Sequence, residues 1–363
     1  DKKFGYVWEA KKEIEAADRI VLAVDRDEPG EALAEELARR IGRAKCYRVQ
    51  WPDGCKDAND ALINLGADRL QELVDEAEPM PLQGVYSADE YGDDIADLYQ
   101  QGLMGGVSTG IPSVDDLMTI VPGQLSIITG LPGSGKSSFV DQIMHNLAVN
   151  ENWKFAVASF ENPVPIHIAK LSELYISKPF FEGPTERMSK DELSHAIKWI
   201  DDHFVFLENR DGEISSLQSI IDRTKSAILR KNVSGLVIDP YNCLESKHES
   251  EHLGISEMLS RITSFSAARQ LSTWFVAHPT KQPYDAKSKP LDGNAIAGSH
   301  SWSSKSDCGL SCYYPGNDNQ PIVSIWKSRF HWIAKKGQQK MQYDVASGRF
   351  SDLPEEDFNW KMD

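Results

Sequence analysis

The stretch that decides the fold is Gly130-Leu131-Pro132-Gly133-Ser134-Gly135-Lys136-Ser137, which matches the phosphate-binding pattern G-x-x-x-x-G-K-[ST]. Its glycines let the backbone wrap closely and aim N–H groups at phosphate oxygens. Lys136 is expected to reach the β- and γ-phosphates, and the Ser137 hydroxyl to bind Mg²⁺. An apolar run, residues 124–129, precedes the loop, and apolar residues recur at helical spacing after it.

A strand, a glycine loop and a helix in this order predict a nucleotide site at the positive end of a helix dipole. The alternative is a glycine-rich turn that matches by accident. The expected contacts with nucleotide are Gly130, Pro132, Gly133, Ser134, Gly135, Lys136, Ser137 and Ser138.

The composition is that of an ordinary globular protein, with 40% hydrophobic and 26% charged residues. A length of 363 residues favours two domains. No apolar run of about 18 residues occurs, so we expect neither a membrane span nor a membrane partner. The chain begins without Met or a signal-peptide pattern, which is typical of a piece of a longer protein. Its 5 scattered cysteines fit an intracellular, reducing setting better than secretion.

The formal net charge of −16 argues at first against a nucleic-acid partner. Net charge governs solubility and steering, however, whereas binding depends on local patches. Residues 325–340 form one such patch, without a single acid; its cations are Lys327, Arg329, Lys335, Lys336 and Lys340. Acids gather instead near the C-terminus, where residues 352–363 are expected to form a solvated acidic tail.

Residues 1–78 predict a small α/β domain, because strand-length apolar runs at residues 19–24 and 46–49 flank a helical stretch. Asp25 and Asp27 follow the first run, where two carboxylates can converge on Mg²⁺. Aspartates are also typical of a helix N-terminus, and the pattern leaves both interpretations open.

This segment resembles the TOPRIM domain of primases and topoisomerases in Asp25 and Asp27, Gly30, and the stretch Lys56-Asp57-Ala58-Asn59-Asp60. In that family a glutamate on an earlier strand completes the metal site, and no equivalent strand precedes Asp25. The resemblance therefore implies a partial TOPRIM domain. Residues 79–106 follow as a linker with an amphipathic helix, whose stripe of Tyr91, Ile95 and Leu98 must be buried on this chain or on a neighbouring subunit.

Residues 107–351 predict a second α/β domain with a mostly parallel sheet covered on both faces, because strands alternate with helices. The expected strands after the glycine loop are residues 154–159, 204–207, 235–238, 273–277, 309–313 and 322–326. Ligands bind beyond the carboxyl ends of such strands. Glu161, Asp239 and His278 occupy those positions.

Asp239 ends an apolar strand and is expected to hold Mg²⁺ through water, rather than only to cap the turn before Pro240. Many P-loop ATPases place the catalytic glutamate directly after this aspartate, where this chain has Pro240. Glu161 is then the best placed base for the attacking water, although a strand-end cap is the alternative. His278 is expected to hydrogen-bond the γ-phosphate; the alternative is a structural histidine.

Lys327 and Arg329 alternate near the end of a strand, so both are expected to face the same side. Surface charge is one interpretation. The other is an arginine finger that acts in trans across a subunit boundary.

The second domain resembles the RecA-like motor of the DnaB-family ring helicases, most of all the phage-type primase-helicases and the mitochondrial Twinkle helicases. Five stretches carry the resemblance: residues 130–137, Ser159-Phe160-Glu161-Asn162, Val237-Ile238-Asp239-Pro240, Ala277-His278-Pro279-Thr280-Lys281 and Lys327-Ser328-Arg329-Phe330. It implies a RecA-like P-loop NTPase domain in which Glu161 is the catalytic base, His278 the γ-phosphate sensor, Arg329 the trans finger and Lys327 its companion cation.

The same resemblance implies an enzyme that hydrolyses ATP, or another NTP or dNTP, with Mg²⁺. It would be a replicative helicase that forms a ring, a hexamer by family analogy, moves 5′ to 3′ on single-stranded DNA and unwinds forked DNA. The implied location is the cytoplasm of a bacterial or phage-infected cell, or an organellar matrix. Two alternatives remain open: a RecA-like DNA-dependent ATPase that forms filaments without unwinding, and the helicase part of a bifunctional primase-helicase.

Family resemblance places the DNA-contacting loops at residues 242–254, 281–289 and 293–305. Lys281, Lys287 and Lys289, with backbone N–H groups at Gly298 and Ser299, are expected to contact phosphates without regard to sequence. Mobile polar loops are the alternative. Members of the family tend to carry a Gln shortly before the position of Asp307, where this chain has Ser303-Ser304-Lys305.

Overall fold

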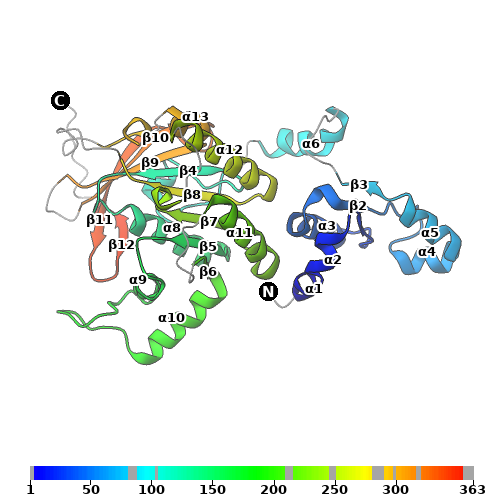
Figure 1. The fold of residues 1–363 in the computed structure, drawn as a ribbon, viewed down its shortest axis with the longest axis horizontal. Helices are drawn as coiled ribbons and strands as arrows, with labels where there is room; N and C mark the ends of the chain where they lie inside the picture. Colours follow the sequence, from blue (N-terminus) through cyan, green and yellow to red (C-terminus); the bar gives the residue numbers. More distant parts are fainter. Residues whose placement is uncertain are drawn as a thin grey trace. The chain divides into compact units, whose positions relative to one another are not determined.

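The computed structural model describes residues 4–80, 88–102, 105–208, 216–244, 251–279, 290–296, 300–315 and 320–354. The chain divides into two compact units (Figure 1). Unit 1 comprises Asp1–Gly102 with Ile228–Asn232, and unit 2 comprises Leu103–Ala227 with Val233–Asp363. The finer division expected from the sequence, with a linker and an acidic tail, stays a prediction.

Unit 1 is a small α/β fold whose three-stranded sheet has the order β1-β2-β3. Strands β1 and β2 are parallel, and β3 pairs antiparallel with β2. The sequence predicted the first two strands and the helix between them, but not α4 and α5. The elements are α1 (Gly5–Glu9), α2 (Lys11–Ala16), β1 (Ile20–Leu22), α3 (Glu28–Ile41), η2 (Arg43–Lys45), β2 (Cys46–Arg48), α4 (Ala58–Leu65), α5 (Ala67–Asp75), β3 (Glu78–Pro79), η3 (Ala88–Tyr91) and α6 (Gly92–Gln101).

Helix α3 begins directly after the Asp-rich turn, and its first turn lies very close to the backbone of Asp25. Asp27 is its N-cap, and its carboxylate accepts a hydrogen bond from the Gly30 N–H at 2.9 Å. A Cβ at Gly30 would lie 2.0 Å from the carbonyl oxygen of Asp25, so only glycine fits there. This close approach explains why a glycine follows the two aspartates at this spacing.

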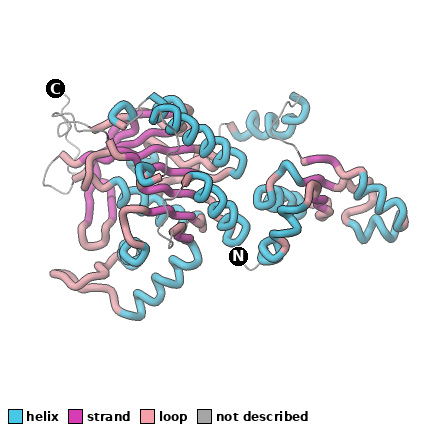
Figure 2. The backbone as a smooth tube through the Cα atoms, in the orientation of Figure 1, coloured by secondary structure: helices cyan, strands magenta, loops and turns pink. Residues whose placement is uncertain are grey.

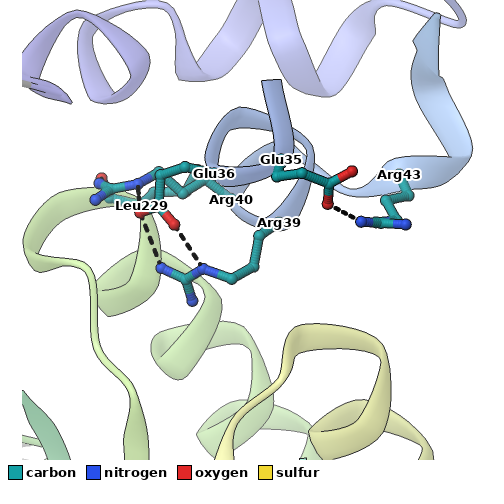
Figure 3. A network of polar contacts seen from close by, with 6 residues as sticks. All are labelled: Glu35, Glu36, Arg39, Arg40, Arg43 and Leu229. Atoms are coloured by element: carbon teal, nitrogen blue, oxygen red, sulfur yellow. Dashed lines mark hydrogen bonds and ion pairs between the residues drawn. The ribbon is translucent and has the colours of Figure 1, made fainter. Parts of the chain in front are cut away.

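The polar network of α3 centres on Glu36 (Figure 3). Its carboxylate accepts hydrogen bonds from Arg39 at 3.0 Å and from Arg40 at 2.7 Å. The buried Arg40 also donates to the carbonyl of Leu229 at 3.1 Å and lies 4.0 Å from the ring of Phe4. Burial lowers the pKa of Arg40, and the Glu36 carboxylate opposes that shift. Glu36 thus compensates a guanidinium that unit 1 holds in its interior.

Unit 2 contains a nine-stranded sheet with the order β12-β11-β10-β9-β4-β8-β7-β5-β6. The strands from β9 to β6 in this order run parallel, whereas β10, β11 and β12 extend the sheet with antiparallel pairs. The predicted mostly parallel sheet is confirmed. The strands are β4 (Leu125–Thr129), β5 (Phe155–Ser159), β6 (Phe204–Phe206), β7 (Gly235–Asp239), β8 (Ser272–Ala277), β9 (Cys308–Tyr313), β10 (Ile322–Ser328), β11 (Gly337–Asp344) and β12 (Arg349–Asp352).

Helices cover both faces of this sheet (Figure 2). Residues of α8, α9 and α10 share one core with residues from β4, β5, β7, β8 and β9, whereas α11 and α12 lie in front of the strands in Figure 1. The helices are α7 (Pro112–Asp115), α8 (Lys136–Glu151), α9 (Val164–Ile176), α10 (Lys190–His203), α11 (Leu217–Lys231), η4 (Tyr241–Cys243), α12 (Glu251–Arg269), η5 (Gly293–Ala295) and α13 (His300–Lys305).

Helix α8, which follows the glycine loop, is buried almost all round. Apolar residues such as Phe139, Ile143 and Leu147 pack into the core, and Asp141, Gln142 and His145 are buried as well. A helix buried on every side is typical of the centre of a layered α/β domain. The end of β4 and the start of α8 are therefore held firmly by their surroundings.

Three sequence expectations differ from the structure. The expected strands ended at residue 326, but β11 and β12 add a hairpin whose alternating, partly polar residues give only a weak strand signal. Asp352, assigned to the tail, is the last residue of β12, and its carboxylate accepts a hydrogen bond from the Ser113 hydroxyl. Residues 251–254 and 300–305, both assigned to loops, are the first turn of α12 and helix α13. In the part of the chain that the structure describes, no helix is long and apolar enough to cross a membrane.

We expect the stability of unit 2 to depend on pH through His145. Burial lowers the pKa of this imidazole to about 4, against an ordinary value of 6.5. As the pH falls from 6.5 towards 4, the unfolded chain therefore takes up a proton that the folded chain refuses, and the free energy of unfolding drops by up to about 3 kcal/mol. Urea unfolding of the His145→Gln variant should show less loss over this range.

The matched control is His195→Gln, which replaces an exposed histidine on α10. It should keep the pH dependence of the unsubstituted protein. Equal pH dependence in the His145 and His195 variants would contradict the role given to burial.

Candidate nucleotide and motor site

The residues expected to act on nucleotide lie at the carboxyl ends of four adjacent strands of unit 2 (Figure 1). The glycine loop follows β4, His278 follows β8, Asp239 ends β7, and Glu161 comes two residues after β5. In the sheet these strands stand in the order β4-β8-β7-β5. Because the strands are parallel, all four segments reach the same edge of the sheet.

The glycine loop has a backbone that other residues adopt only with strain. Gly133 and Gly135 have φ angles of 74° and 88°, in the left-handed region. A Cβ at Gly130 would lie 2.3 Å from the carbonyl oxygen of Cys312 and 2.6 Å from the Ser134 hydroxyl. The loop therefore needs glycine for its backbone angles at Gly133 and Gly135, and at Gly130 both for a φ angle of 150° and for close packing against β9.

The first turn of α8 is covered by the β11–β12 hairpin. The ring of Phe350 would lie 3.3 Å from a Cβ at Gly135 and packs edge-on against Phe139, with ring centroids 5.4 Å apart. Ser138 forms a hydrogen bond with Tyr343 of β11. Pro132 and Gly133, by contrast, are exposed at the tip of the loop. These aromatic contacts fix the helix terminus while leaving the tip open to a ligand.

Lys136 is folded back over the loop. Its ammonium donates to the Leu131 carbonyl at 2.9 Å, and only 5% of the residue is exposed. Burial lowers the pKa of Lys136, while the nearby Asp239 and Glu161 carboxylates oppose this shift. The buried hydroxyl of Ser134 has no hydrogen-bond partner in the described part of the chain. A phosphate oxygen would give the Ser134 hydroxyl a partner and would offer the Lys136 ammonium a charged acceptor in place of the Leu131 carbonyl.

Asp239 has the features expected of a metal-holding carboxylate. It is buried and forms a hydrogen bond with Ser137, while its Oδ1 atom has no partner among the described residues. Burial raises the pKa of Asp239; the bond with Ser137 opposes the shift, and the Asp141 and Glu161 carboxylates add to it. A hydroxyl and a carboxylate with a free oxygen are suited to Mg²⁺, so the residues present fit this ion.

A buried ion pair, which the sequence analysis missed, lies behind Asp239. His167 of α9 contacts Asp141 of α8, with 2.8 Å between Nε2 and Oδ1, and both residues are buried. Burial alone would lower the pKa of His167, but the Asp141 carboxylate outweighs it and the pKa is raised. The pair ties α9 to α8. Neither residue belongs to a motif, so no local signal pointed to them.

Glu161 and His278 are brought together across the strand that separates them. The distance between His278 Nε2 and Glu161 Oε1 is 2.8 Å, and the Glu161 side chain is 48% exposed. The backbone N–H of His278 also donates to the Asn242 side chain at 3.3 Å. The expected base and the expected sensor are thus in direct contact, a relation that their positions in the sequence did not reveal.

Lys327 and Arg329 face the same side, as their alternation predicted, but at the other edge of the sheet. Lys327 donates to the carbonyl of Ser303, and Arg329 donates to the carbonyls of Ser304 and Lys305 at 3.2 and 3.3 Å. Arg329 also forms an ion pair with Asp307 at 2.9 Å. Burial lowers the pKa of Lys327, and the Arg329 charge adds to this effect.

That edge lies at the start of β4 rather than at its end. Asp307 exchanges hydrogen bonds with the backbone of Leu125, the first residue of β4, with its own N–H donating at 2.9 Å and its Oδ2 accepting at 2.9 Å. Strand β4 has 5 residues, so the two ends of the strand are roughly 16 Å apart at about 3.3 Å per residue. The cations and the glycine loop therefore occupy opposite edges of one sheet.

The expected DNA contacts Lys281, Lys287, Lys289, Gly298 and Ser299 lie outside the described residues. Two of their neighbours are described. Trp302 is fully buried against Tyr241, with ring centroids 4.4 Å apart, so it is not a surface on which bases stack. Lys305 donates to the hydroxyls of Ser256 and Ser260 on α12, at 2.7 and 2.5 Å.

In unit 1, the two aspartates considered as a magnesium site contact a lysine. The Lys56 ammonium lies 3.7 Å from Asp25 and 3.0 Å from Asp27. The hydrogen bond from Gly30 and the contact with Lys56 lower the pKa of Asp27. No cluster of three or more acidic, histidine or cysteine side chains suited to a metal occurs among the described residues. Here the helix-cap interpretation describes what Asp27 does.

Comparisons with known proteins agree with this geometry. Residues 106–277 match the family described as the DnaB-like helicase C terminal domain, and residues 6–62 match the Toprim-like family. The Twinkle homolog protein, chloroplastic/mitochondrial, of Arabidopsis thaliana is 37% identical over 98% of this chain and 52% of its own length. The Primase homolog protein of the same plant is 46% identical over 23% of this chain and 26% of its own length.

Two solved structures show the same fold. An ATPase domain matches with a TM-score of 0.63 and 18% identity, over 75% of this chain and 100% of that one. A DnaB-like replicative helicase, solved to show its interactions with primase, matches with a TM-score of 0.61 and 17% identity, over 82% of this chain and 72% of that one. This chain spans about half the length of the first Arabidopsis relative and about a quarter of the second.

We expect Asp239→Asn to raise the stability of the free protein while weakening its binding of Mg²⁺ and nucleotide. The substitution removes a buried charge that lies near two other carboxylates, so the free protein should gain about 1 kcal/mol in its free energy of unfolding. Thermal unfolding with Mg²⁺ and nucleotide should lose the added stabilisation that the unsubstituted protein shows. The control Asp202→Asn, at an exposed position on α10, should change neither quantity; equal behaviour of both variants would contradict the assignment.

Proposed function

The motor unit of this chain belongs to the DnaB-like helicase family, and on that premise we propose that the protein is a replicative DNA helicase. Subunits would assemble into a ring, a hexamer by family analogy, around single-stranded DNA. ATP or another nucleoside triphosphate would drive movement in the 5′ to 3′ direction. The alternative is a RecA-like filament that hydrolyses ATP without unwinding DNA.

One observation carries the ring proposal: the two ends of β4 hold two halves of a hydrolysis site. The glycine loop, Asp239, Glu161 and His278 share the carboxyl edge of the sheet. Lys327 and Arg329 lie at the amino edge, roughly one strand length away, about 16 Å. Neither cation reaches the phosphate site of its own subunit over that distance. Cations at the far edge suit a site completed by the neighbouring subunit.

The cis half supplies binding, metal and base. Lys136 and the loop N–H groups would bind the phosphates, and Ser137 with Asp239 would hold Mg²⁺. Magnesium, when bound, neutralises charge on the β- and γ-phosphate oxygens. Glu161 would orient the attacking water and accept its proton. His278 now contacts Glu161 at 2.8 Å, and a γ-phosphate that accepts a hydrogen bond from His278 would free the carboxylate for that role.

The trans half supplies positive charge to the transition state. Arg329 is the proposed finger and Lys327 its companion, and both would contact the γ-phosphate in the neighbouring subunit. Helix α6 offers a further assembly element, because Ile95, Leu98 and Tyr99 are exposed on it. Their apolar side chains would be buried against a second copy of this chain.

DNA contacts remain assigned to Lys281, Lys287 and Lys289 and to the backbone at Gly298 and Ser299. Their chemistry suits phosphate contacts without sequence preference, which a translocating motor requires. The likeness to a chloroplastic and mitochondrial relative supports an organellar matrix as the location, ahead of a bacterial or phage-infected cytoplasm.

A second candidate activity is primer synthesis by a longer parent protein. The match of unit 1 to the Toprim-like family and to the Primase homolog protein favours it. Asp25 and Asp27 would then hold Mg²⁺, which requires that Lys56 leave both carboxylates. A primer-synthesis assay on the parent protein tests this activity separately from hydrolysis.

We expect Arg329→Ala to bind nucleotide normally but to lose DNA-stimulated hydrolysis by roughly 10³-fold or more, because a trans finger contributes that much to kcat. Mixing Arg329→Ala subunits with Lys136→Ala subunits, each inactive alone, should restore part of the activity. In the mixture, one subunit supplies the phosphate site and the other supplies the finger. Undiminished hydrolysis by Arg329→Ala rules out the trans role.

We expect Glu161→Gln to lower kcat by roughly 10²- to 10⁴-fold, since an amide cannot accept the proton of the attacking water. Affinity for a fluorescent nucleotide should stay close to normal, because Glu161 is half-exposed and does not belong to the loop. The control Glu182→Gln, in an exposed ion pair with Arg187, should keep full activity. A small loss at Glu161 would move the base elsewhere.

A further inference from the structure

Arg329 is held by its own subunit at every contact that the structure describes for its guanidinium. Nη1 lies 2.9 Å from Asp307 Oδ1, and Nη2 donates to the carbonyls of Ser304 and Lys305 at 3.2 and 3.3 Å. These carbonyls belong to the last turn of α13, where they carry the negative end of the helix and attract cations. The guanidinium is thus bound by one carboxylate and two backbone carbonyls of its own subunit.

The two sides of this contact differ in burial and in the number of other bonds that hold them. Asp307 is 7% exposed, and hydrogen bonds at both its N–H and Oδ2 tie it to Leu125 at the start of β4. The Arg329 side chain is 38% exposed and extends from the residue that follows β10. Asp307 is therefore a rigid anchor, and the guanidinium is the part that can leave.

This arrangement competes with the proposed role of Arg329. A guanidinium hydrogen-bonded to a carboxylate of its own subunit has to break that contact before it reaches a phosphate elsewhere. Because the Arg329 side chain is 38% exposed, water can solvate the released guanidinium, and the pair costs less to break than one that is buried on both sides. A γ-phosphate with its larger negative charge is the stronger partner when the neighbouring subunit presents one.

We propose that Asp307 is a positioning residue for hydrolysis. It holds the finger Arg329 in its own subunit, and it so limits turnover until a γ-phosphate at the neighbouring subunit binds the guanidinium. The inference rests on the proposed trans role of Arg329. Lys327 binds the same helix end, because it donates to the carbonyl of Ser303, the residue directly before Ser304 in α13. Asp307 contacts no reacting atom and acts only through Arg329.

A purely structural ion pair makes a different prediction. If Asp307 served only to join β4, α13 and β10, removing its charge would lower stability and leave or reduce hydrolysis. If it holds the finger, removing its charge frees Arg329, and hydrolysis without DNA becomes faster. The direction of the change in turnover separates the two roles.

The test is Asp307→Asn in the full chain, with hydrolysis measured with and without single-stranded DNA. The amide keeps the size of the side chain and an oxygen for the Leu125 N–H, but loses the charge that holds Arg329. We expect kcat without DNA to rise about fivefold, the weight of one partly exposed ion pair. KM should stay unchanged, and the ratio of DNA-stimulated to basal turnover should fall by the same factor.

The double variant Asp307→Asn/Arg329→Ala shows whether the effect passes through Arg329. Its hydrolysis should equal that of Arg329→Ala alone, because neighbouring residues that act through one another are not additive. The control Asp222→Asn removes a carboxylate paired with Lys225 on the surface of α11, and it should leave both turnover rates unchanged. Urea unfolding of each variant confirms that the protein is folded.

Unchanged or slower DNA-independent hydrolysis by folded Asp307→Asn overturns the inference. If that variant does not fold, Asp307→Ser provides the same test with a smaller side chain that cannot form the ion pair. Failure of the proposed function looks different, because in that case Arg329→Ala by itself retains hydrolysis. If Arg329→Ala is inactive while both Asp307 variants lack the rise, only the inference about Asp307 is wrong.

Discussion

The direction of β4 is the constraint on which the rest of the motor depends. A strand has two chemically different ends, and a parallel sheet places all ends of one kind at the same edge. At the carboxyl end of β4 the chain turns into the glycine loop, where the N–H groups of α8 point outward. At the amino end, Leu125 is bound to Asp307, which in turn holds Arg329. One strand of five residues thus separates the proposed binding site for phosphate from two cationic side chains.

The antiparallel strand β10 places Lys327 and Arg329 at the edge of the sheet where β4 begins. Strand β9 runs parallel to β4, and β10 returns antiparallel beside it, so β10 ends where β4 begins. Strands β9 and β10 pack closely against each other where they pair: a Cβ at Gly309 would lie 2.3 Å from the ring of Trp326. The register of the pair shifts at this point, between Ile325 and Lys327. A glycine opposite a large ring lets β9 and β10 remain paired up to the two cations.

The charged side chains near the glycine loop are buried in the ligand-free protein. Lys136, Asp239 and the pair of Asp141 with His167 all lie in the interior of unit 2. Buried groups interact strongly because little water screens them, and groups that are already close together reduce the rearrangement that a charged ligand requires. The arrangement lowers stability in the free protein, as the raised pKa of Asp239 indicates. Functional sites commonly trade stability for this kind of preorganisation.

What the sequence by itself determined is local. The apolar run at residues 124–129, the glycines at 130, 133 and 135, and the helix after Lys136 specify strand, loop and helix through short-range backbone preferences. The ends of the buried strands pointed in the same way to Glu161, Asp239 and His278, since each follows a continuous apolar run. Alternation also predicted correctly that Lys327 and Arg329 share one side.

Only the tertiary structure decided how these pieces meet. The order of strands in the sheet places His278 against Glu161 and sends Arg329 to the edge opposite the glycine loop. It also buries Trp302 and pairs Asp141 with His167. Each of these relations joins segments that are distant in the chain or depends on side-chain packing, and no residue pattern within one segment encodes it. The reason is physical: a strand's own residues determine that it is buried, but its neighbours in the sheet are chosen by packing across the whole domain.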